Sequence, residues 1–497
     1  MYSRLRLAWN LLSDNGVLVA SIDENELVNL RKLLDEVFGE NNLLFQITLL
    51  CNPKGRSQDK FVANCHEYLV GYSKQQLNKG DINVPKDDDE IEKNYKLFDK
   101  HGRYRELELR NTHREFGKHN RRNLYYPFFV NNSGKVLLEE TPGFVSVYPD
   151  WDDGFEGCWT WGIDKARQQL DEIVAKEIKA NWKIYRKNYA VDEDGEATKQ
   201  VKSIWTEKQF HTEKGQAAFN ELFETKDKIF QSPKSVDTLR QLLLMGACKD
   251  ALIIDFFSGS ATSAHAVMAL NAEDGGQRKF IMVQIPEPCD EKSEAYKAGY
   301  PTIAEIGKER IRRAGKKIKT ENADKESIEQ LDIGFRVLKI DSSNMKDVYY
   351  TPDQLKQGDL DQFTDNIKDD RSAEDLLFQV LLDWGVDLTL PITQETIRVK
   401  SEFGKVKGEE KRVKNDDIHS SPVTLQSSKE YTVFFVDGNV LAACFDTDIN
   451  ETFVKELAAL HPLRVVFRDA GFVSDSVKIN IEQIFKLISP STEIKTL

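Results

Sequence analysis

The sequence predicts an α/β fold with a parallel β-sheet, and three stretches carry that prediction. Residues 252–254 (LII) form an apolar run without alternation, as in a central parallel strand covered on both faces. A small-residue loop (258–260) and a helical segment (261–270) follow, and residues 280–285 (FIMVQI) form a second apolar strand. A strand that enters a helix through such a loop leaves a crevice at its carboxyl end, where open α/β sheets bind ligands.

The residues around this loop favour a nucleoside ligand. Asp255 ends the first strand, and Gly259 is small enough for a ligand to approach the backbone. Glu287 lies just past the second strand, where an acidic residue commonly accepts hydrogen bonds from an adenosine ribose. Neither G-x-G-x-x-G nor Gly-Lys-Ser/Thr is present, so we expect a ligand without a pyrophosphate group. A β–α connection without a ligand is the alternative for a lone Gly-Ser loop.

Composition limits the class of protein. A chain of 497 residues predicts two to four domains, and 40% hydrophobic with 30% charged residues is typical of a soluble globular protein. No apolar run approaches the roughly 20 residues of a membrane span, and no signal peptide is recognisable. Six cysteines without C-x-x-C and eight histidines without H-x-x-x-H argue against a metal site and fit a reducing cytoplasm. A net charge of −13 excludes a globally basic binder but allows a local basic groove.

The N-terminal segment predicts two α/β elements before any candidate site. Residues 1–12 have helical spacing, and residues 17–22 (VLVASI) form a strand. Asp23 and Glu26 match a D-x-x-E capping pattern for the next helix, and Gly39 ends it.

The character of the chain changes at Gln75. Residues 101–122 hold seven Lys or Arg against three acidic residues, with aromatic residues interleaved. Basic side chains for phosphates and aromatic rings for bases are typical of nucleic-acid binding. A basic face packed on acidic neighbours explains the composition equally well, but its place between two core segments favours DNA. Residues 163–188 have the spacing of a long amphipathic helix that could support this region.

The later part of the chain predicts a second, smaller α/β domain. Ser235 caps a helix over 236–245, and a basic helix spans 302–318. Beyond residue 320 we expect a separate domain without a catalytic constellation. Its expected elements are a strand at 333–340, a helix capped by Ser372, a hairpin over 431–444, a helix at 450–460 and a strand at 463–467.

At the predicted crevice the chain resembles a known family. D-x-F-x-G-S-x-T (255–262), followed by S-A-H-A-V and N-A-E-D-G-G-Q-R-K-F, is similar to the S-adenosylmethionine motif of DNA amino-methyltransferases. The similarity is greatest to the modification subunits of type III restriction-modification systems, and it is most specific over 17–74 and 226–318. Ala261 stands where many relatives have a second glycine. Alanine can occupy this position if its φ is negative, so we expect the departure to affect the loop geometry rather than to remove the site.

The resemblance implies a Rossmann-like, S-adenosylmethionine-dependent methyltransferase core with an incomplete sheet. Residues 1–74 and 226–320 would form this core, 75–225 an inserted target-recognition region, and 321–497 a C-terminal assembly domain. It also implies double-stranded DNA, a second copy of the chain and a type III restriction subunit as partners, in the cytoplasm.

The resemblance also implies site residues. The cofactor would be bound by Asp255, Phe257, Gly259, Ser260, Thr262 and Glu287, with Lys234 of an F-x-x-P-K motif at its methionine end. In the family, the stretch that matches H-E-Y-L (66–69) flanks the target-base pocket; for Glu67 itself an ordinary strand position is the favoured interpretation. DNA contact is expected from Arg103, Arg105, Arg110, Arg114, Lys118, Arg121 and Arg122.

One family motif is missing. Amino-methyltransferases hold the exocyclic amine of a flipped base with a D/N/S-P-P-Y/F/W tetrapeptide. The nearest sequences begin at Asn52, Tyr148 and Ser232, and none has Pro-Pro. In the resembled subgroup this motif precedes the recognition region, so we expect an N-terminally shortened subunit, inactive alone, and assign no catalytic residue.

Three functions therefore remain open. The first is a DNA adenine N6-methyltransferase subunit, in which N6 of a flipped adenine attacks the cofactor's methyl group. The second is a non-catalytic module for DNA recognition or assembly. The third, a nicotinamide-dependent oxidoreductase, is disfavoured by the absent G-x-G-x-x-G.

Overall fold

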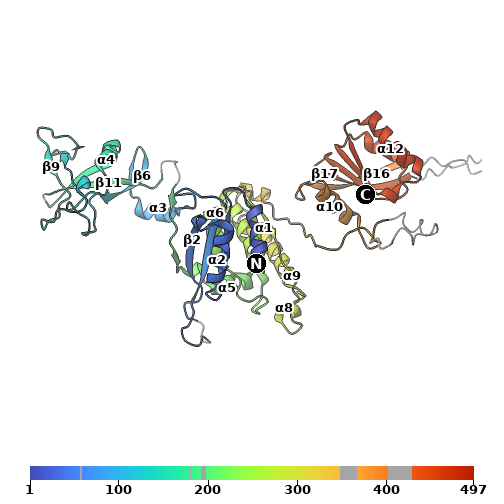
Figure 1. Cartoon of the computed structure of the whole chain (residues 1–497), viewed down its shortest axis with the longest axis horizontal. Helices are drawn as coiled ribbons and strands as arrows, with labels where there is room; N and C mark the ends of the chain where they lie inside the picture. Colours follow the sequence, from blue (N-terminus) through green and yellow to red (C-terminus); the bar gives the residue numbers. More distant parts are fainter. Residues whose placement is uncertain (56–58, 180, 192–196, 347–365, 401–427) are drawn as a thin grey trace, which may run out of the picture. The chain divides into compact units, whose positions relative to one another are not determined.

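The computed structural model describes residues 1–55, 59–179, 181–191, 197–346, 366–400 and 428–497. They form two compact units, Met1–Arg336 and Val337–Leu497, which are described separately. Both units contain helices and strands, with several separate sheets in the first unit and one sheet in the second, so the predicted α/β class is confirmed (Figure 1). Among the residues that the structure describes, no helix is long and apolar enough to cross a membrane.

The N-terminal elements form a mixed four-stranded sheet in the order β1-β3-β2-β13. β1 and β2 both pair antiparallel with β3, and β13 joins β2 in parallel. The strand predicted at 17–22 is thus present. The elements are α1 (Tyr2–Leu11), β1 (Val17–Ile22), α2 (Leu27–Phe38), β2 (Leu43–Leu50), β3 (His66–Ser73) and β13 (Ile204–Trp205).

Both faces of this sheet are covered. Leu34 of α2 packs with Val70 of β3 on one face, in a cluster that includes Leu5 of α1. Leu69, on the opposite side of β3, packs with Met245 of α6 (Val236–Gly246). Alternating strand side chains supply the two clusters, so apolar burial holds α1, α2 and α6 to the sheet.

The capping pattern predicted at Asp23 is wrong. Helix α2 begins at Leu27, and the Asp23 carboxylate accepts a hydrogen bond from the backbone N–H of Asn25 at 3.1 Å. Glu26 is the N-cap residue, but its side chain accepts no capping hydrogen bond. An Asp can close a turn with the same local geometry that it uses to cap a helix, which explains the error. The end predicted at Gly39 is confirmed, with φ +87°.

A second, two-stranded parallel sheet carries the predicted crevice. β14 (Leu252–Asp255) pairs with β15 (Lys279–Met282), and α7 (Thr262–Asp274) connects them. Ser235 caps α6 as predicted, and the structure shows in addition that Thr302 caps α9 (Ile303–Glu321); each hydroxyl accepts a backbone N–H. Also in this part are α5 (Thr212–Phe223) and α8 (Glu294–Lys297).

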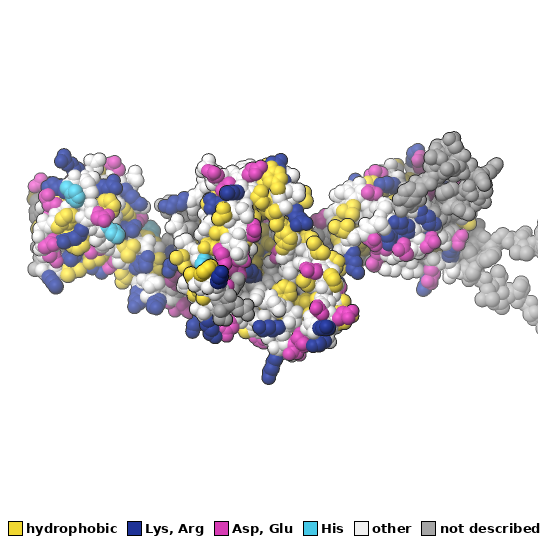
Figure 2. Space-filling model, turned by 60° about the horizontal axis from the view of Figure 1, so that its bottom comes forward, with side chains coloured by type: hydrophobic (Ala, Val, Ile, Leu, Met, Phe, Trp, Pro, Cys, Tyr) yellow, Lys and Arg dark blue, Asp and Glu magenta, His cyan; other side chains and the backbone are white. Residues whose placement is uncertain are grey.

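Coverage of β14 on both faces was predicted and is not observed. Phe280 and Met282 pack toward the cluster formed with α7 and α9. Leu252, Ile254 and Ile281 instead expose 57%, 37% and 44% of their surface, and Figure 2 shows hydrophobic side chains on the surface of the middle part of the chain. No further strand or helix covers that face within the described residues, and the predicted single Rossmann-like sheet is divided into two.

The inserted region between β3 and β13 contains mostly short strands. One sheet has the order β10-β11-β6-β5, and a smaller one has the order β8-β7-β9. The bounds are β4 (Val84–Pro85), α3 (Asp88–Asn94), β5 (Leu97–Asp99), β6 (Gly102–Glu108), β7 (Phe128–Val130), β8 (Val136–Leu137), β9 (Val145–Val147), α4 (Ile163–Gln168), β10 (Ile173–Ile178), β11 (Asn181–Tyr189) and β12 (Thr198–Lys199).

The long helix predicted over 163–188 is therefore wrong. Only α4 is helical, and β10 and β11 form an antiparallel hairpin. Ile173, Ala175 and Ile184 are buried on one face, and Lys179 has a φ of +51° at the turn. Burial that alternates at the start of β10 and a left-handed residue at the turn are typical of a hairpin, and they outweigh the helical spacing of the apolar positions.

The C-terminal unit is a five-stranded mixed sheet in the order β16-β17-β18-β19-β20. The predicted hairpin is confirmed in β17 and β18, and Ser372 forms a capping box with Asp375. The strand predicted at 333–340 is absent. The elements are α10 (Ala373–Asp383), β16 (Ile392–Lys400), β17 (Ser428–Val436), β18 (Leu441–Cys444), α11 (Glu451–Ala458), β19 (Arg464–Phe467), α12 (Asp475–Ile488) and β20 (Glu493–Thr496).

Candidate functional site

The strand–helix loop, residues 255–262, is held from both ends by side-chain hydrogen bonds. Asp255 accepts the backbone N–H of Phe257 at 3.2 Å and the Ser263 hydroxyl at 2.5 Å. The N–H of Gly259 donates to Gln284 Oε1 at 2.7 Å, and Gly259 has a φ of +50°. Asp255 thus closes the turn into α7, while Gln284, just past β15, fixes the middle of the loop.

Ala261 adopts the left-handed conformation, with φ +56°, so the condition of a negative φ, under which alanine would fit easily, is not met. An L-residue other than glycine costs about 1–2 kcal/mol in this conformation. Ala261 is only 2% exposed, and its N–H donates to Ser258 O at 2.7 Å. The surrounding contacts therefore stabilise a backbone geometry for which glycine would be the less strained residue.

Ser260 and Thr262 direct their hydroxyls into the protein. Both side chains accept hydrogen bonds from Arg310 Nη1 of α9, at 2.9 and 2.6 Å. All three residues are buried, and Arg310 is 0% exposed. The hydroxyls are therefore engaged by the protein. No sequence pattern marks Arg310 as a buried residue, because it lies in a basic helix beside the solvent-accessible Arg312 and Arg313.

Two predicted residues around the loop are open to a ligand. Phe257 is 56% exposed, with the guanidinium of Arg4 in α1 lying 5.8 Å from its ring centroid. Glu287 is also exposed, and its backbone carbonyl accepts the N–H of Ile303 at 3.0 Å. That bond ties the end of the second strand to the start of α9 and leaves the Glu287 carboxylate available as an acceptor.

The F-x-x-P-K segment lies beside the same loop. A Cβ on Gly259 would lie 3.4 Å from Cζ of Phe230. Lys234 forms an ion pair with Glu67 of β3, whose side chain is 18% exposed. Lys234 is thus already paired, and Glu67, which was expected to be an ordinary strand residue, is its partner. Burial, with the negative charge of Glu67, raises the pKa of the nearby Cys51 to about 11, so that thiol stays protonated.

His265 of α7 makes the stability of this region depend on pH. Its Nδ1 is enclosed without a hydrogen-bond partner among the described residues. Burial, with the charges of Arg310 and Lys317, lowers its pKa to about 3. Below pH 6.5 the imidazole of His265 binds a proton in the unfolded chain but not in the native state. Protonation therefore favours unfolding, and this residue should lower the free energy of unfolding by about 2 kcal/mol at pH 5.

Urea unfolding at pH 7.5 and pH 5 tests this expectation, with His265→Gln as the comparison. The variant should lose less stability on acidification than the parent chain, since its side chain does not titrate. Equal losses in both proteins would contradict it.

Four of the seven basic residues predicted to contact DNA are held by neighbouring side chains. Arg105 donates to Asn188 at 2.9 Å, and Arg110 pairs with Glu108 at 2.7 Å. Arg114 pairs with Asp153 and thereby lowers the pKa of that carboxyl, and Lys118 pairs with Glu156 at 2.5 Å. The guanidinium groups of Arg110 and Arg114 also lie 4.3 and 4.8 Å from the Trp151 ring centroid. Packing against acidic and aromatic neighbours explains these four positions.

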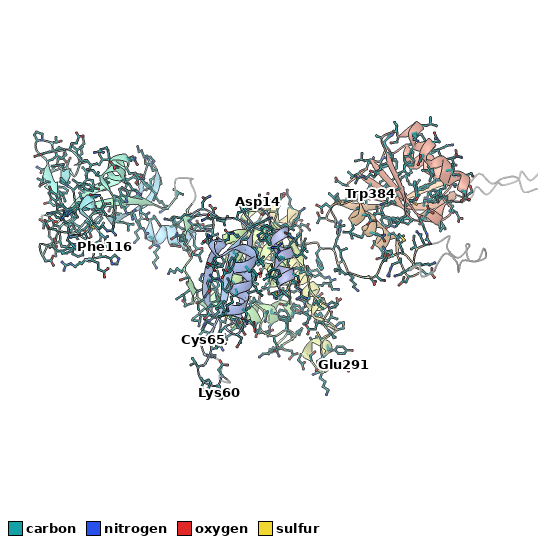
Figure 3. All side chains as sticks on the ribbon, viewed as in Figure 1. Asp14, Lys60, Cys65, Phe116, Glu291 and Trp384 are labelled. Carbon is teal, nitrogen blue, oxygen red and sulfur yellow. The ribbon has the colours of Figure 1, made fainter. Side chains whose placement is uncertain are left out.

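The other three basic residues are exposed. Arg121 lies over the ring of Phe116, which Figure 3 labels, at 5.2 Å from its centroid. Arg103 and Arg122 make no salt bridge within the part of the chain that the structure describes. Their guanidinium groups are available to an anionic partner.

The connection between β2 and β3 projects from the core, with Lys60 far out and Cys65 at its base (Figure 3). Phe61 and Val62 are 87% and 82% exposed.

No cluster of three or more potential metal ligands occurs among the described residues. A cleft lined mainly by residues of β2 and the segments 76–83 and 200–203 contains none of the predicted cofactor residues.

Comparison with known proteins places the chain in a family. The DNA methylase family model matches residues 1–297. The chain is 33% identical over 349 residues to the type III restriction-modification enzyme EcoPI Mod subunit of Escherichia phage P1, a match that covers 68% of this chain and 52% of that protein. It is 31% identical over 372 residues to the StyLTI Mod subunit of Salmonella typhimurium (73% and 50%), and 32% identical over 308 residues to the type II methyltransferase M.KpnI of Klebsiella pneumoniae (61% and 70%). The chain thus spans about half the length of the two Mod subunits.

Proposed function

Because the chain belongs to the DNA methylase family, we propose that it is the DNA adenine N6-methyltransferase subunit of a type III restriction-modification system. The observation that carries this proposal is the loop at the end of β14, in which Gly259 and Ala261 have left-handed backbone conformations, together with the exposed carboxylate of Glu287 past the neighbouring strand. Similarity to Mod subunits supports the type III assignment.

The residues around the loop fit S-adenosylmethionine, which when bound would supply the methyl group. Glu287 can accept hydrogen bonds from ribose hydroxyls, and the exposed ring of Phe257 can cover an apolar face of the ligand. Gly259 lets the ligand approach the backbone, and Asp255 holds the loop in shape. Lys234 could form an ion pair with the methionine carboxylate, but its ammonium group would then interact with that carboxylate and with Glu67 at the same time.

We further propose that the two core sheets belong to one Rossmann-like sheet. Among the described residues β14 pairs with β15 on one side and with no strand on the other, and its outer face exposes Leu252 and Ile254. The unpaired edge supports an additional strand beside β14, and the exposed face supports a further covering element, since parallel strands are normally covered on both faces. The absent Pro-Pro tetrapeptide would be supplied with that strand.

Calorimetric titration of the purified chain with S-adenosylmethionine tests the cofactor assignment. Asp255→Ala should abolish binding by releasing Phe257 and Ser263. Asp250→Ala, an exposed aspartate in the turn before β14, is the matched control and should leave binding intact. Equal binding by both variants would reject the assignment.

The region 75–225 is the proposed reader of the DNA site, and its exposed arginines lead to a prediction. Replacing Arg103 and Arg122 together by alanine should weaken duplex binding and reduce the slope of log K against log salt by about two, because each phosphate contact contributes about one. Fluorescence anisotropy at several salt concentrations measures both quantities. Arg167→Ala, on the exposed part of α4, should change neither; an unchanged slope in the double variant would remove these arginines from the interface.

The proposed partners are double-stranded DNA, a second copy of the chain and a restriction subunit, and the proposed location is the cytoplasm. A non-catalytic recognition or assembly module is the second candidate, favoured by the absent tetrapeptide. Sequence-specific DNA retention that does not depend on S-adenosylmethionine would favour this module over the methyltransferase subunit.

A further inference from the structure

Arg310 is a buried cation with few partners. It is 0% exposed, and its guanidinium lies 5.6 Å from the ring centroid of Phe219. Nη1 donates to the two hydroxyls of the strand–helix loop, whereas Nε and Nη2 have no hydrogen-bond partner among the described residues. No carboxylate pairs with it in this part of the chain. Burying a charge without a counter-ion costs free energy of folding, so a structural or functional role for this arginine is expected.

The segment that Arg310 holds is the least relaxed part of the loop. Ser260 and Thr262 flank Ala261, whose backbone is left-handed at φ +56°. Fixing the side chains on both sides of Ala261 restricts the rotation by which this residue would return to a right-handed conformation. The two hydrogen bonds and the strained residue therefore form one local unit.

Helix α9 is shaped to bring Arg310 to this unit. Gly307 lies one turn before Arg310, and a Cβ there would lie 3.2 Å from Gly259 O and 3.5 Å from the Cβ of Ala261. The glycine therefore lets the backbone of α9 lie directly against the loop. With the helix at that distance, the arginine side chain reaches the hydroxyls of Ser260 and Thr262.

We propose that Arg310 is a positioning residue for cofactor binding: through Ser260 and Thr262 it keeps Ala261 left-handed and so maintains the loop that receives S-adenosylmethionine. This inference rests on the proposed function for its ligand, but not for its effect on the loop. Arg310 does not touch the ligand, since its side chain is enclosed by protein.

The test compares Arg310→Met with Arg312→Met, an exposed arginine of the same helix. Hydrogen exchange of the backbone amides of residues 259–263 is measured without any ligand, and the Kd for S-adenosylmethionine is measured by calorimetry. Arg310→Met should speed exchange in this segment at least tenfold and weaken binding at least tenfold, whereas Arg312→Met should change neither. Arg310→Lys, which keeps a donor, should restore part of both.

A suppressor separates positioning from general stability. Adding Ala261→Gly to Arg310→Met should recover most of the cofactor affinity, since glycine adopts φ +56° without strain. Should Arg310→Met fail to fold, Ser260→Ala combined with Thr262→Val removes the two acceptors and should produce the same loosening. Unchanged exchange at 259–263 in a folded variant would overturn the inference. Faster exchange in a chain whose parent binds no S-adenosylmethionine would support the positioning of the loop and reject the proposed function instead.

Discussion

Purified by itself, this chain is expected to transfer no methyl group from labelled S-adenosylmethionine to DNA. No two consecutive prolines occur in its sequence, so it has no tetrapeptide to hold the amine of a flipped adenine against the methyl group. Such positioning can be equivalent to an effective concentration of about 10⁵ M or more, and its loss should leave no turnover above background. The measurement is incorporation of radiolabelled methyl into a duplex that contains the recognised site.

Complementation distinguishes a missing motif from a misfolded chain. A segment that carries the family's Pro-Pro tetrapeptide, co-expressed with this chain, should restore methylation. The same segment with its two prolines replaced by alanine is the control and should restore none. Methyl transfer by the chain alone would contradict both the prediction and the proposed incomplete sheet.

The predicted elements succeeded where one local signal decided the structure. Ser235 and Ser372 each cap a helix as predicted, because a hydroxyl can satisfy the free N–H groups of a first turn almost regardless of the rest of the fold. Predictions failed where two local structures compete for the same residues. Asp23 closes a turn rather than capping a helix, and the apolar residues of 173–184 alternate along strands although they also have helical spacing.

Burial and pairing at the site were beyond the reach of sequence patterns. The apolar run 252–254 indicates a strand, but it cannot say whether other elements cover both faces of that strand. Lys234 and Glu67 are 167 positions apart in the sequence, so only the folded chain shows that they pair. Arg310 is similarly indistinguishable from the neighbouring arginines of its helix until the contact with Ser260 is seen. Residues that act through long-range contacts therefore had to come from the structure.

Gly307→Val is expected to disable the cofactor site as well as to destabilise the fold. The added Cβ would lie 3.2 Å from Gly259 O, a backbone atom, so the loop itself must move. Overpacking of this kind costs about 1–3 kcal/mol of stability. A loop displaced from Gln284 and Arg310 should lose affinity for S-adenosylmethionine by about 30-fold or more, equivalent to about 2 kcal/mol. Calorimetry measures the affinity, and urea unfolding measures the stability.

Gly315→Val provides a control on the same helix with the same change in side chain. A Cβ at Gly315 would lie 2.8 Å from Cβ of Ile333 and would not meet the loop. Both variants share the gain in helix propensity from replacing glycine, so differences between them come from the contacts alone. We expect similar losses of stability but a loss of cofactor affinity only in Gly307→Val. Equal affinities in the two variants would mean that α9 does not set the geometry of the loop, and the site would then depend on Asp255 and Gln284 alone.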